Sequence, residues 1–283
     1  RQVKENASIA DALAAWGIAP DFYCDCMDSL RFVHRQTPQA EIYWVNNRSY
    51  QTRSLDARFR VTGMKPYLWH PETGEVSAVD YTPAAGYTQV SLQMNPSEAY
   101  FIVFRTESDP TAAKAVKVDT QTVAATLEGP WTVTFQPDRG APAQTTMAQL
   151  HSLSESDDAG IRYFAGTATY RKSVKFTKAQ IRGKRFWINL GQMSALAEVI
   201  VNGKNLGILW RAPFSTEITD ALRRGNNDIE IRVTTLWRNR IIGDQQPDCP
   251  KRYTYTSYPF YKKDSKLQPS GLIGPVTLTE MPR

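Results

Sequence analysis

The side chains best suited to binding chemistry lie between positions 237 and 261 of this chain. Trp237-Arg238-Asn239-Arg240 is followed by Asp244, and five of the nine residues from Tyr253 to Tyr261 are aromatic. Aromatic faces bind the C–H patches of a sugar ring, and amide, carboxylate and guanidinium groups bind its hydroxyls. These residues supply the mixture of groups that sugar binding needs. The candidate carbohydrate-binding residues are Trp210, Trp237, Asn239, Arg240, Asp244, Tyr253 and Tyr255.

Two arrangements of these residues are open. In the first, Trp237, Arg240, Asp244, Tyr253 and Tyr255 cluster in space and turn their polar ends toward a surface pocket. In the second, the rings cap the fold or pack against a domain that this sequence does not contain. Asn239, Arg240 and Asp244 then form a buried, salt-bridged corner.

Catalytic chemistry has less support. A glycosidase needs two carboxyl groups about 5–10 Å apart across the scissile bond. Acidic residues are abundant, but their spacing singles out no pair: Asp138, Glu155, Asp157, Asp158, Glu198, Glu217, Asp244 and Asp248. Only three histidines occur, no Gly-x-Ser-x-Gly motif frames a nucleophile, and no phosphate-binding loop is present. We therefore assign no catalytic residue.

The composition excludes several kinds of partner. The net charge of +6 comes from dispersed Lys and Arg residues, without the basic patch or recognition motif of a nucleic-acid-binding protein. No run of eighteen apolar residues occurs, so no membrane-spanning segment is predicted. The first residue is Arg1 rather than Met, which indicates a processed or excised chain from which any export signal has been removed.

The three cysteines, Cys24, Cys26 and Cys249, do not indicate a disulfide framework because their number is odd. Cys24 and Cys26 would lie far apart on one face of an extended strand, so free or partly buried thiols are expected. Cys-x-Cys without a nearby histidine is weak support for a metal site, and we assign no metal ligand. No cofactor is expected. Structural calcium is common in β-sandwiches, but no oxygen-rich ligand run indicates it here.

The elements that must position these residues are mainly strands. A capping box at Ser8–Asp11 predicts a short helix that stops at Gly17. From residue 30, short β-branched and aromatic segments separated by turn residues predict a small β-sandwich. The expected strands are 32–35, 42–45, 55–61, 67–69, 76–81, 90–92 and 100–104.

A second series of strands follows a polar, alanine-rich stretch at residues 107–126, which we interpret as a linker or a covering strand. The expected strands are 131–135, 164–176, 185–190, 198–201, 206–210, 229–236 and 275–279. Asn202-Gly203 between alternating apolar residues predicts a tight hairpin. The long loops 138–158 and 243–270 are of the kind that is usually functional or shielding.

The segment Ala197–Asp244 resembles the galactose-binding-like jelly roll, a sugar-binding β-sandwich attached to many glycoside hydrolases. Six blocks resemble a β-region of the bacterial α-L-rhamnosidases of glycoside hydrolase family 106. These are Ala40–Asn47 with Phe59–Gly63 and Leu68–Gly74, then Ile161–Tyr170, then Leu236–Asp244 with Pro269–Val276. The blocks span nearly the whole chain and correspond to the C-terminal part of those enzymes.

The resemblance implies an all-β chain with two β-sandwich domains, the second a galactose-binding-like jelly roll, and a short N-terminal helix. The expected division is residues 1–20 as the remnant of a preceding domain, 21–106 as a small β-sandwich, 107–125 as a linker and 126–283 as the jelly-roll domain. The catalytic glutamates of the family belong to an upstream barrel, for which this chain has no matching pattern. The chain itself is therefore expected not to be catalytic.

Three functions fit this resemblance. The favoured one is an accessory C-terminal region of a secreted or periplasmic bacterial rhamnosidase-like hydrolase that acts on plant or microbial polysaccharides. The alternatives are an independent carbohydrate-binding module and a purely structural scaffold for a catalytic barrel. The expected partners are carbohydrate and the upstream catalytic domain of the same polypeptide, with no nucleic acid and no membrane.

Overall fold

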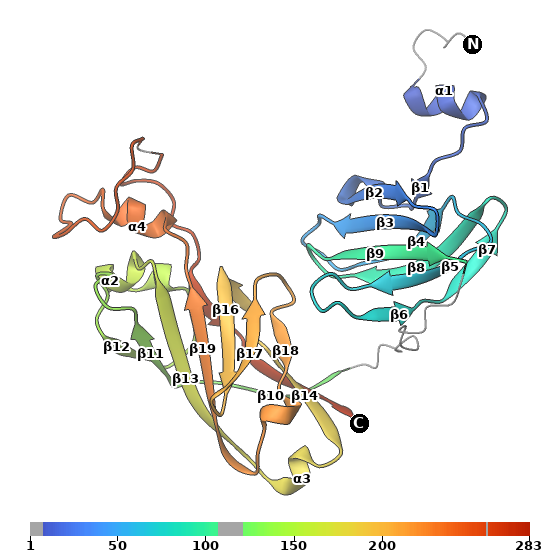
Figure 1. The fold of residues 1–283 in the computed structure, drawn as a ribbon. Helices are drawn as coiled ribbons and strands as arrows, with labels where there is room; N and C mark the ends of the chain where they lie inside the picture. Colours follow the sequence, from blue (N-terminus) through green and yellow to red (C-terminus); the bar gives the residue numbers. More distant parts are fainter. Residues whose placement is uncertain (1–7, 107–120, 259) are drawn as a thin grey trace. The chain divides into compact units, whose positions relative to one another are not determined.

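A computed structural model describes residues 8–106, 121–258 and 260–283 (Figure 1). The chain divides into two compact units, Arg1–Val118 and Asp119–Arg283, and each is described here by itself. Most of the predicted linker, at residues 107–120, lies outside the described residues. No helix in the described part is long and apolar enough to cross a membrane.

The short helix at the start of the first unit, α1 (Ile9–Ala15), forms as the sequence predicts. The Ser8 hydroxyl accepts a hydrogen bond from the Asp11 amide, and the Asp11 carboxylate accepts one from the Ser8 amide. This reciprocal pair satisfies amides that the first turn leaves without partners. Gly17 follows with a φ of +71°, which a glycine adopts readily and which ends the helix.

Two antiparallel sheets form the body of the first unit (Figure 1). One has the strand order β1-β4-β8-β7 and the other the order β2-β3-β9-β5-β6. The strands are β1 (Phe22–Tyr23), β2 (Leu30–Gln36), β3 (Ala40–Asn47), β4 (Arg53–Phe59), β5 (Lys65–Trp69), β6 (Val76–Ala78), β7 (Tyr81–Ala84), β8 (Tyr87–Met94) and β9 (Ala99–Arg105). The predicted strand 76–81 is two strands, and β1 was not predicted.

The core of the first unit lies between these sheets. On β4, Leu55, Ala57 and Phe59 are buried while the residues between them are exposed, which is the alternation expected of a sheet with one solvated face. Phe59 packs against Tyr43 of β3 and Phe104 of β9, with ring centroids 4.9 and 5.3 Å apart. Aromatic contacts between the two sheets therefore hold the sandwich together.

The cysteines of the first unit are free thiols, as expected, but their spacing differs from the prediction. The Sγ atoms of Cys24 and Cys26 lie 3.3 Å apart because the chain turns at residues 25–26 instead of continuing as a strand. Burial raises the pKa of the Cys24 thiol to about 12. Cys24 therefore remains a protonated thiol at neutral pH.

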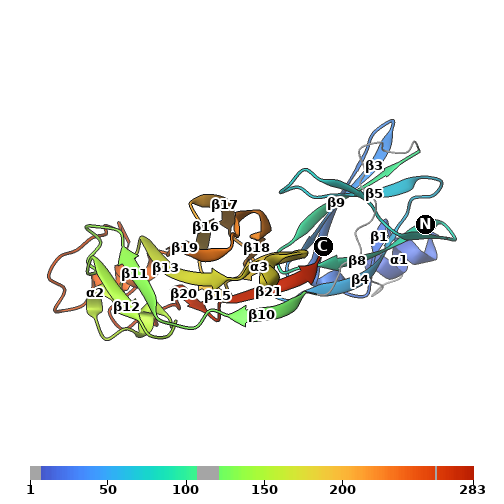
Figure 2. The same cartoon turned by 90° about the horizontal axis from the view of Figure 1, so that it is seen from below.

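The second unit is also built from antiparallel sheets, with the orders β12-β11-β13-β19-β16-β17 and β10-β21-β14-β18 and a small pair β15-β20. In Figure 2, β10 and β21 lie side by side along this unit, in agreement with their pairing. The strands are β10 (Thr122–Thr126), β11 (Trp131–Phe135), β12 (Gln144–Met147), β13 (Thr167–Phe176), β14 (Lys184–Asn189), β15 (Gln192–Ser194), β16 (Leu196–Val201), β17 (Lys204–Leu209), β18 (Ser215–Glu217), β19 (Gly225–Thr234), β20 (Gly271–Gly274) and β21 (Thr277–Pro282).

The described part of this unit also has three short α-helices, α2 (Ala159–Arg162), α3 (Lys178–Ile181) and α4 (Arg238–Gly243), and two 3-10 turns at Leu153–Glu155 and Thr219–Ala221. None of the three α-helices was predicted. One core fills the space between the two larger sheets, with Tyr170 and Ile231 from one and Phe186, Ile188 and Leu278 from the other. Both units are thus β-sandwiches, and the predicted all-β fold class is confirmed.

The predicted Asn-Gly hairpin joins β16 to β17, and Val201 pairs with Lys204. Asn202 and Gly203 have φ values of +52° and +82°, the left-handed pair that a two-residue type I′ turn requires. The Asn202 side chain also donates hydrogen bonds to the carbonyl of Ala221 and to Oδ1 of Asn227, both at 2.8 Å. The hairpin is therefore fastened to β19 and to the segment that precedes it.

Candidate functional site

The predicted sugar-binding segment begins at the end of β19, where the chain leaves the six-stranded sheet and forms α4. Asn239, Arg240 and Ile242 are buried on the inner face of this helix. Trp237 at its start is 43% exposed, and the guanidinium group of Arg139 lies 4.9 Å from its ring centroid. The helix thus turns its central polar residues inward and leaves the tryptophan at the surface.

A buried ion pair occupies the inner side of α4. Nε of Arg240 lies 2.8 Å from Oδ1 of Asp244, one helical turn along the chain, and both side chains are almost fully buried. The Arg240 guanidinium lies 5.2 Å from the ring centroid of Tyr253 and 5.8 Å from that of Tyr163. Two aromatic rings therefore line the cation as well, an arrangement that favours arginine over lysine.

Asp244 holds the start of the aromatic loop, which we define as residues 251–266. Its Oδ2 accepts hydrogen bonds from the amides of Tyr253 and Thr254, at 3.0 and 2.7 Å, and from the Thr254 hydroxyl at 2.7 Å. With the ion pair to Arg240, both carboxylate oxygens are engaged. Hydrogen bonds to a charged acceptor are stronger than neutral ones, so Asp244 is the main anchor of this loop.

Asn239 secures the chain just after the aromatic loop. Its side-chain nitrogen donates to the carbonyl of Gln268 at 2.7 Å, and its oxygen accepts from the amide of Gln268 at 2.8 Å. The Arg238 guanidinium donates to the carbonyl of Lys266 at 3.1 Å and lies 4.9 Å from the Tyr261 ring centroid. Side chains of α4 therefore fix both ends of a loop that has no strand or helix in its described residues.

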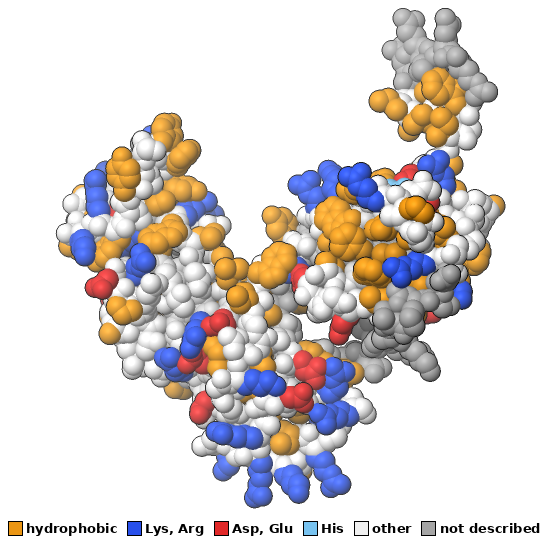
Figure 3. Space-filling view, in the orientation of Figure 1, with side chains coloured by type: hydrophobic (Ala, Val, Ile, Leu, Met, Phe, Trp, Pro, Cys, Tyr) orange, Lys and Arg blue, Asp and Glu red, His pale blue; other side chains and the backbone are white. Residues whose placement is uncertain are grey.

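The tip of the aromatic loop carries exposed rings. Tyr255, Tyr258 and Phe260 are 92%, 63% and 75% exposed, and the last two rings contact each other with centroids 4.8 Å apart. In Figure 3 hydrophobic side chains gather at the end of the second unit above α4. Large rings left in water at one place mark an interaction surface more often than isolated exposed residues do.

The fold brings some of the predicted site residues together and separates others. Arg240, Asp244 and Tyr253 lie together, Asn239 lies on the same helix, and Tyr255 extends into solvent. Trp210 is 53% exposed and follows β17. β17 pairs with β16, and β16 pairs with β19. Trp210 therefore lies at the same end of the sheet as α4, two strands from β19. The assignment of these residues to sugar binding stays a prediction.

A small cavity of about 120 Å³ lies beside this cluster, lined by Arg240, Tyr253, Tyr163, Asp248 and Lys251 among others. Pockets that bind whole small molecules usually measure about 300–1,000 Å³. This cavity has room for a single chemical group of a ligand and not for a complete sugar ring. A saccharide would therefore contact the exposed rings outside the cavity.

Close packing against glycines positions the rings beside Arg240. A Cβ atom on Gly243 would lie 2.5 Å from the Tyr163 side chain, and one on Gly140 would lie 3.1 Å from the Tyr253 ring. Gly140 also has a φ of +90°, which other residues rarely adopt. Sequence reasoning missed Tyr163, Gly140 and Gly243 as parts of this site, because each comes from a different segment and none has a distinguishing local pattern.

The carboxyl groups with shifted pKa values do not have the character of a glycosidase acid. The general acid of such an enzyme needs a raised pKa. The Arg185 guanidinium lowers the pKa of Glu217 by hydrogen bonding, and Arg171 and Arg232 lower that of Glu230 against its burial. These two carboxyl groups act as acceptors in surface ion pairs.

A compact polar cluster surrounds His34 in the first unit. Its two ring nitrogens lie 2.8 Å from an oxygen of Asp21 and 2.7 Å from an oxygen of Glu41, and its ring stacks on Tyr43 with centroids 3.9 Å apart. Burial and the nearby Asp21 carboxylate raise the pKa of the Tyr43 hydroxyl, which donates to Asp21. The cluster ties Asp21 to β2 and β3, which gives it a structural role.

Comparison with known proteins supports the predicted resemblance. The family model described as alpha-L-rhamnosidase, glycoside hydrolase family 106, matches residues 1–83. A solved rhamnosidase structure from Novosphingobium sp. PP1Y matches 96% of this chain with 43% identity and a TM-score of 0.81. A putative beta-glucuronidase of Formosa agariphila is 34% identical over 176 residues, 54% of this chain.

The matched region is a small part of each relative. This chain covers 26% of the rhamnosidase structure and 15% of the putative beta-glucuronidase. The resemblance to the rhamnosidases is thereby confirmed, and the chain is related to glycoside hydrolases. Most of the length of those proteins has no counterpart in it.

Proposed function

We propose that this chain is a non-catalytic, carbohydrate-associated C-terminal region of a secreted or periplasmic glycoside hydrolase of the α-L-rhamnosidase type. The observation that supports this best is the match of nearly the whole chain to about a quarter of a rhamnosidase. A region of this size beside a separate catalytic domain serves to bind the polysaccharide substrate or to support that domain.

The aromatic loop is the surface that we assign to carbohydrate. Hydrogen bonds to Asp244 and Asn239 hold the two ends of this loop. Because the ends are already fixed, binding a saccharide costs less of the free energy that is otherwise lost in ordering a loop. Tyr255 and Tyr258 offer flat apolar faces and hydroxyl groups, the combination that suits a polysaccharide chain. Their neighbours Arg252 and Lys251 add donors for sugar hydroxyls.

The main alternative is a scaffold, in which the same rings pack against the upstream catalytic domain. Such contacts also require exposed apolar side chains in the isolated chain. The two functions differ in the saccharide affinity that they predict for the isolated chain, because a scaffold has no affinity for saccharide. An independent carbohydrate-binding module would bind with full affinity without any upstream domain.

The first prediction concerns hydrolysis. Incubated by itself with an aryl α-L-rhamnoside, the chain is expected to release aryl alcohol no faster than buffer. The measurement is the absorbance of the released chromophore at high protein concentration. Turnover that survives repurification and is lost when one carboxylate is changed to an amide would contradict a non-catalytic role.

The second prediction concerns the aromatic loop. Titration with oligosaccharides, followed by NMR, is expected to show binding in the millimolar range, and Tyr255→Ala should weaken it about threefold to tenfold. The ring is 92% exposed, so its loss should leave the melting temperature unchanged. Tyr50→Ala is the matched control, since that ring is 94% exposed and belongs to the first unit. Equal binding by Tyr255→Ala and the parent chain would exclude the loop as the site.

A further inference from the structure

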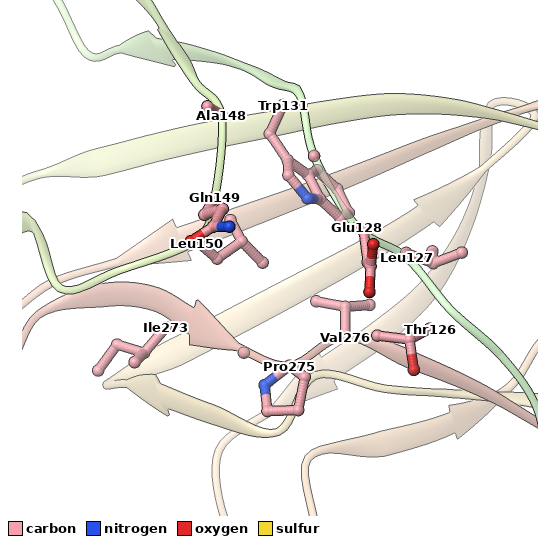
Figure 4. A pocket seen from close by; sticks show the side chains of 12 residues that line it. Thr126, Leu127, Glu128, Trp131, Ala148, Gln149, Leu150, Ile273, Pro275 and Val276 are labelled. Atoms are coloured by element: carbon pink, nitrogen blue, oxygen red, sulfur yellow. The ribbon is translucent and has the colours of Figure 1, made fainter.

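A second and larger depression lies in the second unit, away from the aromatic loop (Figure 4). Its volume is about 520 Å³, within the range of about 300–1,000 Å³ typical of small-molecule sites. Three separate segments line it: residues 126–131, which join the two sheets, residues 148–150 after β12, and residues 273–276 between β20 and β21. We call it the Trp131 pocket.

The indole of Trp131 packs beside this pocket. The side chain is fully buried, and its Nε1 has no hydrogen-bond partner in the part of the chain that the structure describes. Figure 4 shows the nitrogen on the side of the ring that faces the pocket. This nitrogen has almost no surface that a water molecule can reach, so the indole packs against the pocket and does not itself bind a ligand there.

Two further polar groups lie on opposite sides of the Trp131 pocket. Figure 4 shows the Glu128 carboxylate on one side and the Gln149 amide on the other, with the indole between them. Both side chains are exposed to solvent. Together they offer carboxylate and amide acceptors and an amide donor to one ligand.

The rest of the lining is apolar. Figure 4 shows Ile273, Pro275 and Val276 below the indole of Trp131, and Leu150 beside Gln149. A ligand that carries hydroxyls on one side and a C–H surface on the other matches this division. Glu128 is the charged residue in the lining, so the described lining has no group of cationic side chains that would bind an anionic ligand. A neutral sugar ring has this chemistry.

The wall of the Trp131 pocket is rigid. A Cβ atom on Gly129 would lie 1.6 Å from the carbonyl oxygen of Ala148, so only glycine allows these two segments to approach so closely. The ammonium of Lys172 donates to the carbonyls of Gly129 and Pro130, at 3.2 and 3.3 Å, and lies 5.6 Å from the Trp131 ring centroid. A site that is already formed loses little free energy in ordering when it binds.

We propose that the Trp131 pocket binds one neutral monosaccharide unit, as a second carbohydrate site separate from the aromatic loop. Glu128 and Gln149 bind hydroxyl groups, and the apolar wall packs against the C–H face. The choice of a sugar as ligand rests on the proposed function. The position of the site rests on the pocket itself.

The test is an NMR titration of the whole ¹⁵N-labelled chain with L-rhamnose and, separately, D-galactose at millimolar concentrations. The indole signal of Trp131 is identified by its absence from the spectrum of Trp131→Phe. It is expected to shift on addition of sugar. Glu128→Gln should weaken binding about tenfold, because a charged acceptor is replaced by a neutral one. Glu155→Gln, which changes an exposed glutamate outside the pocket, should leave the affinity unchanged.

Three results would overturn the inference. Sugar could shift only the indole signals of Trp210 and Trp237, which would exclude the Trp131 pocket and leave the aromatic loop as the site. The amine ethanolamine could shift the Trp131 signal at lower concentration than either sugar, which would assign the pocket to cations. An unmoved Trp131 signal with both sugars, while Tyr255→Ala still weakens oligosaccharide binding, would reject the pocket and retain the proposed function.

Discussion

Asp244→Asn is expected to destabilise the second unit by about 3–5 kcal/mol, the usual cost of removing one partner from a buried ion pair. The substitution keeps the volume of the side chain but replaces one acceptor oxygen by a donor. Both oxygens of Asp244 face donors: Arg240 on one side and the Tyr253 and Thr254 amides on the other. In either orientation of the new side-chain amide, its NH₂ group faces an N–H donor and can form no hydrogen bond with it.

Urea unfolding followed by tryptophan fluorescence measures this effect. The transition of the second unit should move to lower urea concentration, while that of the first unit stays in place. Asp248→Asn is the matched control, because that exposed residue is four positions away, and its loss should change stability by less than about 0.5 kcal/mol. An Asp244→Asn chain as stable as the control would show that the ion pair is not the anchor of the aromatic loop.

Asn227→Leu is expected to have the next largest effect, about 2–4 kcal/mol. Asn227 is completely buried at the start of β19. Its side chain donates to the carbonyls of Arg223 and Gly225 and accepts from the Arg223 amide and the Asn202 side chain, all within 2.9 Å. Leucine fills the same space but leaves these buried groups without partners, each at a cost of about 1–3 kcal/mol when it cannot reach water.

The matched control is Asn226→Leu, since the neighbouring side chain points to solvent. Thermal unfolding of both variants gives the comparison. A large loss for Asn227→Leu with little change for Asn226→Leu would confirm that the network joins the β16–β17 hairpin to β19. Similar losses for the two would mean that strand register, and not the buried network, determines the stability here.

Helix caps, turns and strands that are specified by neighbouring residues could be predicted from the sequence. The Ser8–Asp11 capping box and the Asn202-Gly203 turn are both completed within four residues, so the local sequence specifies them. Alternation of apolar and polar residues located most of the strands of both sandwiches because each strand buries one face. Several short elements were missed, among them the strands β12, β18 and β20 and the helices α2, α3 and α4, although α3 begins with a capping box of its own at Thr177 and Gln180.

Only the tertiary structure decided which side chains meet. The sequence placed Trp237, Arg240 and Asp244 close together along the chain, but the direction in which α4 faces turns the charged pair inward and leaves Trp237 at the surface. The Trp131 pocket combines segments that lie up to about 150 residues apart, and none of them carries a binding motif of its own. The sequence by itself determined the all-β class, the hairpin and the aromatic loop, because these follow from local periodicity and turn chemistry. Burial, pairing of charges and the pocket follow from contacts between distant segments, and those exist only once the sheets have packed.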